Sequence, residues 1–198
     1  MPEKSPIGKL TDTIFGFALA IGALSLTRSS PQDVSEVLGG LFLFGLSFVI
    51  LIVIWWGHND LMSKLPDNTP RIVVLNIVLM FFVAVEPYLL NILNSNIALF
   101  QFNSILYAVD MTFLMGISAV LAQILVTDCG RTLSITEMRT YKSSRNFQTV
   151  CACLFLLSVI PQFFTWTLMG VPVRIYLWLA TLVLSIAVRA RKKGKKED

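Results

Sequence analysis

Apolar stretches long enough to cross a lipid bilayer follow one another along almost the whole chain. Six of them lie between residues 10 and 188, separated by short polar segments. A helix that spans a bilayer needs about 20 mostly apolar residues. Of the 198 residues, 55% are hydrophobic and only 14% are charged, so a water-soluble fold would lack polar residues for its surface. The sequence therefore predicts an integral membrane protein.

We expect an all-α membrane protein, a single bundle of six transmembrane helices. The spans are predicted at approximately residues 10–27, 37–58, 71–93, 97–127, 146–169 and 171–188, and residues 189–198 form a basic tail. All but two of the 16 Lys and Arg residues, Arg28 and Arg174, lie on one side of this topology. Because basic loops stay in the cytoplasm, both termini are predicted to be cytoplasmic.

The same composition argues against several classes of function. The chain has a single histidine and no His-Glu-x-x-His or Ser-His-Asp pattern, so we expect no enzyme activity. Cys129, Cys151 and Cys153 have neither metal-ligand nor disulfide spacing, and we expect no cofactor and no structural metal. The net charge of +4 is explained by orientation in the membrane, so no nucleic acid partner is expected.

The first span carries one stripe that suits the wall of a pore. Phe17, Ile21 and Leu24 recur at helical spacing, with Thr13 and Thr27 beyond them on the same face. A face that is polar at both ends and apolar in the middle suits a path with a constriction, if several copies surround it. Small residues at Gly16/Ala20 and Ala18/Gly22 equally suit a tightly packed bundle helix without a pore.

A second set of residues can hold the first span in place. Asp12 lies at its cytoplasmic start, and the second span ends on the same side with Trp55 and His58 on one face. Depth alone allows Asp12 to meet either residue, which would tie the two spans together. The alternative is that Thr11 or Asp12 only caps the helix, while Trp55 and His58 lie at the membrane interface.

These positions resemble the transmembrane protein 175 family of potassium channels. Leu10-Thr11-Asp12 stands where the family has Phe-Ser-Asp, and Phe15 follows where it repeats an aromatic residue. The second span matches a further pattern of the family with Ser47-Phe48, Trp55 and His58-Asn59. The chain departs from the family at Leu10-Thr11, at Asn59 in place of a second His, and at Pro6 in place of an Arg, for which Lys9 can substitute.

The resemblance implies a homotetramer whose four first helices line a path for potassium or other monovalent cations. The family's pore-lining positions are occupied by Phe17, Ala20, Ile21 and Leu24, the first two of which are commonly Ile and Thr. The residues implied to hold the pore helix are Asp12, Thr11, Trp55, His58 and Ser47. The partners are then the lipid bilayer and the permeant ions, and the expected location is the plasma membrane of a prokaryote.

The chain has no Thr-Val-Gly-Tyr-Gly-like filter, and its outer linkers are too short for a re-entrant loop. Selection and gating would therefore fall to a hydrophobic gate formed by Phe17, Ile21 and Leu24.

Two acids in the third and fourth spans leave a second function open. Glu86 and Asp110 both fall in the outer half of a predicted hairpin, and a buried acid in a membrane often marks an ion path. A pair that shares a proton would suit a proton-coupled secondary transporter. Alternatively, neutral Asp110 bonds Asn103 or Tyr107 and staples the bundle, while Glu86 reaches water.

Overall fold

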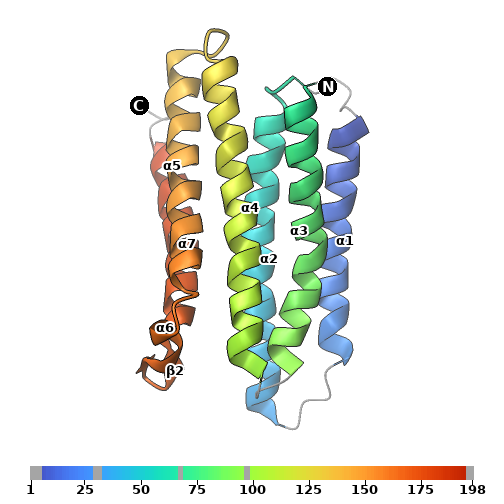
Figure 1. Ribbon diagram of the computed structural model, residues 1–198, viewed down its shortest axis with the longest axis vertical. Coiled ribbons are helices and arrows are strands. Elements are labelled where there is room, and N and C mark those ends of the chain that lie inside the picture. The colour runs from blue at the N-terminus through green and yellow to red at the C-terminus, as the bar shows by residue number, and fades with distance from the viewer. Residues whose placement is uncertain (1–5, 29–32, 67–68, 96–98, 195–198) are drawn as a thin grey trace.

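Long helices that run alongside one another make up the computed structural model, which describes residues 6–28, 33–66, 69–95 and 99–194 (Figure 1). The long helices are α1 (Pro6–Arg28), α2 (Val34–Met62), α3 (Pro70–Ser95), α4 (Phe100–Asp128), α5 (Ile135–Leu157) and α7 (Val173–Gly194). Between α5 and α7 lie the short helix α6 (Gln162–Thr165) and the strands β1 (Thr167–Leu168) and β2 (Val171–Pro172). Helix α1 begins and α7 ends at the same end of the bundle, which we call the termini end. The opposite end, which holds α6 and the two strands, is the hairpin end.

Helix α4 is the centre of the bundle. It packs against α5 on one side and against α3 and α2 on the other, and fourteen of its residues are buried. The helices that make extensive contacts with α1 are α3 and α2. Helix α1 therefore forms one edge of the protomer (Figure 1). Helices α5 and α7 form the opposite edge. One face of α1 is consequently left uncovered by the protomer.

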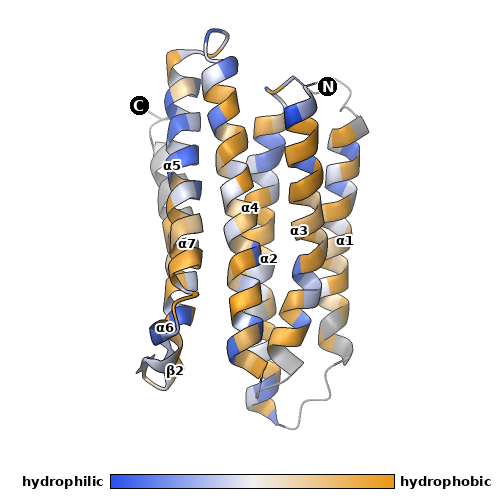
Figure 2. Ribbon diagram, viewed as in Figure 1, coloured by the Kyte–Doolittle hydropathy of each residue, from blue (hydrophilic) through white to orange (hydrophobic). Residues whose placement is uncertain are grey.

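Four helices are long and apolar enough to cross a membrane. They are α1 through α4, with qualifying segments at Ile7–Leu24, Val34–Met62, Pro70–Leu93 and Phe100–Asp128. Helix α5 does not qualify, because its first half carries Arg139, Lys142 and Arg145 toward the termini end. Figure 2 shows this for α5, whose hydrophilic residues gather in the half nearer the termini end. Within the described part of the chain, the first four of the six predicted spans thus coincide with apolar helices of sufficient length.

Helix α5 does not occupy the range that the sequence analysis assigned to its span. A span was expected at 146–169 after a polar connection, but the helix begins at Ile135 and ends at Leu157. It begins early because Ser134 and Glu137 form a capping box. The Glu137 N–H donates to Ser134 Oγ at 3.2 Å, and the Ser134 N–H donates to Glu137 Oε2 at 2.9 Å. The charged segment is thus helical rather than a loop.

The connection to α7 also differs from the expectation. The predicted spans 146–169 and 171–188 leave only residue 170 between them, but the turn residues are Met169 and Gly170, with φ of 51° and 78°. Leu168 pairs with Val171 across this turn, so residues 171–172 form a strand. Two positive φ angles in a two-residue turn match the right-handed twist of an antiparallel hairpin. Helix α7 then runs to Gly194, through part of the predicted tail, while 195–198 lie outside the described residues.

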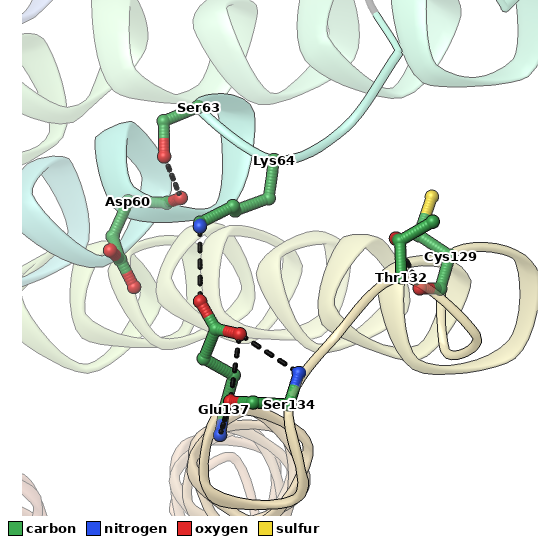
Figure 3. Close-up of polar contacts among 7 residues, drawn as sticks. All are labelled: Asp60, Ser63, Lys64, Cys129, Thr132, Ser134 and Glu137. Carbon is green, nitrogen blue, oxygen red and sulfur yellow. Dashed lines mark hydrogen bonds and ion pairs between the residues drawn. The ribbon is translucent and has the colours of Figure 1, made fainter.

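An ion pair joins α5 to the end of α2. Lys64, just beyond α2, places its Nζ 3.0 Å from Glu137 Oε1, as Figure 3 shows. The backbone N–H of Ser134 and, next, the Lys64 ammonium lower the pKa of Glu137 from 4.5 to about 2. A carboxyl with a depressed pKa stabilises the fold above its ordinary pKa, and this contribution is lost as the pH falls toward 2.

We therefore expect Glu137→Gln to remove part of the acid sensitivity of the fold. The measurement is the melting temperature in detergent as the pH is lowered from about 6 to about 3, through the window where the unfolded carboxyl gains its proton. Lys64→Met should retain most of the wild-type acid sensitivity, because the Ser134 N–H remains. A Glu137→Gln curve that follows the wild type at every pH would contradict this account.

Candidate functional site

Helix α1 has a buried face and an exposed face. Thr11, Phe15, Ala18 and Gly22 are buried against the neighbouring helices, at spacings of four, three and four residues. Those spacings place all four on one side of a helix. Gly22 allows close approach to α2, because an added Cβ would lie 3.3 Å from the Phe44 ring. One side of α1 is therefore committed to packing within the protomer.

The predicted pore residues lie on the other face. Phe17, Ile21 and Leu24 expose 63%, 52% and 60% of their surface, and Thr13 and Ala20 are also exposed. The side chain of Thr27 lies outside the described residues. Thr13 Oγ1 donates to the carbonyl of Lys9 at 2.9 Å, so its hydroxyl is engaged by its own helix. We call Thr13, Phe17, Ala20, Ile21 and Leu24 the α1 stripe; it points away from the protomer core.

At the termini end, polar contacts tie α1 to two helices. The Trp55 indole N–H of α2 donates to Asp12 Oδ1 at 2.9 Å. Asn76 Nδ2 of α3 donates to Thr11 Oγ1 at 3.3 Å, and Thr11 Oγ1 itself donates to the Ile7 carbonyl at 2.9 Å. Because these bonds lie where little water competes, they position α1 more firmly than surface contacts would. We call Asp12, Thr11, Trp55 and Asn76 the anchor cluster.

His58 lies beside the anchor cluster. It is 2% exposed, and its ring centroid is 6.3 Å from that of Phe15 on α1. Neither ring nitrogen makes a hydrogen bond within the described part of the chain, although Asp12 and Asn76 interact with the ring electrostatically. The His58 ring is therefore packed between helices of the protomer, close to Asp12 as one of the two alternatives expected. Asn76 was missed by sequence reasoning, although a single amide in an apolar stretch is a usable signal.

Ser47 lies apart from the anchor cluster with which the sequence grouped it. It is eight residues before Trp55, so about 12 Å closer to the hairpin end. There its hydroxyl donates to Glu86 Oε1 of α3. Ser47 therefore joins α2 to α3 and does not contact Asp12 in the described contacts.

Glu86 and Asp110 are both inside the protomer. They are 2% and 3% exposed, so the expectation that Glu86 reaches water is wrong. Asp110 interacts electrostatically with Glu86, and both interact with buried Tyr107. Neither oxygen of Asp110 has a hydrogen-bond partner among the described residues. Asn103, the expected partner, instead donates to the Ile92 carbonyl at 2.7 Å.

Arg174 is a buried cation that the sequence placed only on the outer side. It is 0% exposed, and its Nε donates to the Ser158 carbonyl at 2.6 Å. Its Nη1 donates to Ser104 Oγ and to the Gln101 carbonyl, and its guanidinium lies over the Phe164 ring. Arg174 thus joins α4, α5 and α7 toward the hairpin end. In the described part of the chain no three His, Cys, Asp or Glu side chains gather as a metal site.

Comparison with known proteins gives one family match in sequence and two related structures, all of them potassium channels by description. Residues 7–87 match the family described as endosomal/lysosomal potassium channel TMEM175, which covers α1, α2 and most of α3. In fold, 98% of the chain superimposes on 95% of the potassium channel MtTMEM175, crystallised as a variant with a nanobody–MBP fusion, at 18% identity and a TM-score of 0.66.

A lysosomal potassium-selective channel TMEM175 homolog from Chamaesiphon minutus gives a TM-score of 0.63 at 18% identity, over 93% of this chain and 95% of that one. At 18% identity, the structural likeness to these two channels shows a shared fold. No curated protein matches the chain in sequence.

Proposed function

We propose that this chain is a member of the TMEM175 family, a potassium channel of a lipid membrane and not an enzyme, because residues 7–87 match that family. The family match covers the helices that carry the α1 stripe and the anchor cluster, and the two related structures are named as potassium channels. The single observation that carries the proposal is the division of α1 into an anchored face and an exposed apolar stripe.

The path for ions would lie between protomers. The interior of one protomer is occupied by the buried, mostly apolar residues of α4 and its neighbours, which would not suit a hydrated ion. Helix α1 is at the edge of the protomer, so several copies can bring their stripes together about a symmetry axis. We propose a homotetramer, as the family resemblance implies, with four copies of α1 around the path.

The constriction would be apolar. Rings of Phe17, Ile21 and Leu24 would narrow the path, and Thr13 and Thr27 would flank it with hydroxyl groups. A narrow apolar ring holds back ions because they must shed water there without receiving oxygen ligands in return. Such a ring acts as a gate when a small change in its width lets water in or out.

In the membrane we propose six spans with both termini in the cytoplasm. The positions of the start of α1 and the end of α7 at one end of the bundle support an even number of spans. Lys64 and Arg131 in the connections at that end, Arg71 at the start of α3, and Arg139 and Lys142 in the first turns of α5 are basic, as expected for a cytoplasmic side. The apolar half of α5 and the first half of α7 would supply the remaining two spans. The proposed location is the plasma membrane of a prokaryote.

Sustained current in a planar bilayer tests the channel proposal. The purified chain, reconstituted in lipid, should pass current whose reversal potential follows the potassium gradient. Its mass in a native-like lipid particle should correspond to four chains. A monomer, or a reversal potential that ignores potassium, would refute the channel as proposed.

One observation keeps a proton-coupled transporter as a second candidate. Asp110 is buried without a hydrogen-bond partner among the described residues, as ion-coupling acids in carriers often are. A transporter would saturate with substrate, follow the pH gradient and stop in Asp110→Asn. A channel would do none of these.

A further inference from the structure

The interior between α2, α3 and α4 holds two acids that face no cation among the described residues. Glu86 of α3 and Asp110 of α4 are each at least 97% buried and interact with one another electrostatically. Tyr107, one turn before Asp110, interacts with both, and its ring packs 5.0 Å from Trp178 of α7. Ser47 is the polar group that α2 contributes.

The hydrogen bonds leave Asp110 without donors. Ser47 gives its one hydroxyl proton to Glu86 Oε1, while both oxygens of Asp110 lack a partner within the described part of the chain. The buried cation of the protomer, Arg174, is engaged by Ser158, Ser104 and Gln101. Helix α1 brings only Ala18, Leu19 and Gly22 to the crevice that reaches Ser47 and Glu86. No packed neighbour therefore supplies a positive charge to the pair.

An ionised carboxylate in such a place would be very costly. Isolated burial of a charge costs several kcal/mol even after relaxation, and a second carboxylate nearby adds repulsion. A metal ion could neutralise the pair only with about six oxygen ligands, and the described residues offer no group of three acidic, His or Cys side chains. A proton needs one oxygen and no extra room.

We propose that Glu86 and Asp110 form a proton-binding site inside each protomer, separate from the α1 stripe, with Asp110 carrying the proton at neutral pH. Glu86 is the acid of the pair that lines the narrow crevice with Gly22, Phe44 and Phe48. Proton exchange would take place through Glu86. The crevice is also lined by residues of the packed face of α1. Loss of the proton would therefore change the packing of the helix that carries the α1 stripe.

Infrared difference spectroscopy tests the proton directly. The full chain in lipid at about pH 7 should show the carbonyl band of a protonated carboxylic acid, since an exposed carboxyl is ionised at that pH. Asp110→Asn should remove the band, whereas Asp128→Asn, at the exposed end of the same helix, should leave it intact. A wild-type protein without the band, or an Asp110→Asn variant that keeps all of it, would overturn the proposal.

The pH dependence of stability is the second measurement. If the folded protomer holds a proton that the unfolded chain releases, the melting temperature falls as the pH rises from about 6 to about 9. The fall should be several degrees in the wild type and in Asp128→Asn, and it should be largely absent in Asp110→Asn. Should Asp110→Asn fail to fold, the wild-type protein still decides the question, because a melting temperature that does not fall over this pH range, or a spectrum without the band, would overturn the proposal.

Stability that rises with potassium concentration and ignores pH would refute a proton site in favour of a bound cation. Neither measurement depends on conduction. A conducting protein without the band would refute this site alone, and a protein with the band that carries no current would refute the channel alone.

Discussion

Alanine at Phe17 or Ile21 is expected to raise the potassium current of closed or weakly open channels on the order of tenfold. Each substitution enters every copy in the ring, and a barrier lowered by about 1.4 kcal/mol in total gives that factor. The reason is that smaller side chains widen the apolar constriction, so less water must be removed from a passing ion. Single-channel current and leak in planar bilayers measure the effect, and selectivity for potassium over sodium should fall with it.

Helix α3 offers matched controls. Ile77 and Phe81 expose 55% and 61% of their surface, close to the 52% of Ile21 and the 63% of Phe17. Their alanine variants remove the same groups from a helix that we expect to face lipid, so the current should stay near the wild-type value. Equal effects of Ile21→Ala and Ile77→Ala would mean that the α1 stripe does not line the path.

Loss of the bond between Trp55 and Asp12 is expected to close or disorder the channel. The indole N–H donates to a carboxylate, and such charge-assisted bonds contribute about 1.5–3 kcal/mol. Trp55→Phe keeps an aromatic ring at this position but removes the indole N–H, so the Asp12 carboxylate loses that hydrogen bond. Because this bond fixes the termini end of α1, we expect a current reduced by about an order of magnitude, together with a lower melting temperature.

A double-mutant cycle separates this bond from general damage. Trp55→Phe, Asp12→Asn and the double variant should show a coupling energy of about 1 kcal/mol or more, since residues in direct contact do not behave additively. Trp56→Phe is the matched control, because Trp56 is the next residue of α2 and is 62% exposed. If Trp55→Phe and Trp56→Phe have the same small effect, the anchor cluster does not hold the pore helix.

Part of this structure could be read from the order of residues. Apolar length places α1 to α4, and the shared depth of Asp12 and Trp55 at one end of two neighbouring spans predicts that they can meet. The capping box at Ser134 and Glu137 follows the Ser-x-x-Glu pattern, so the early start of α5 was available in the sequence although it was not used.

The partners of buried polar side chains could not be predicted from the sequence. Depth in the membrane follows from counting residues at 1.5 Å per residue, but the rotation of each helix about its axis does not. Ser47 could face α1 or α3 equally well until packing turned it toward Glu86. In the same manner Asn103 was free to bond Asp110, but the approach of α3 gave it the Ile92 carbonyl instead.

The sequence by itself determined that this is a membrane protein whose first helix carries an apolar stripe, because hydrophobic length and helical spacing are properties of a single segment. Tertiary structure alone decided which face of that helix is packed, where Glu86 and Asp110 lie, and that Arg174 is buried among carbonyl and hydroxyl oxygens. Those outcomes depend on how several helices share one interior, where a buried polar group can take a partner only from a neighbour that is turned toward it.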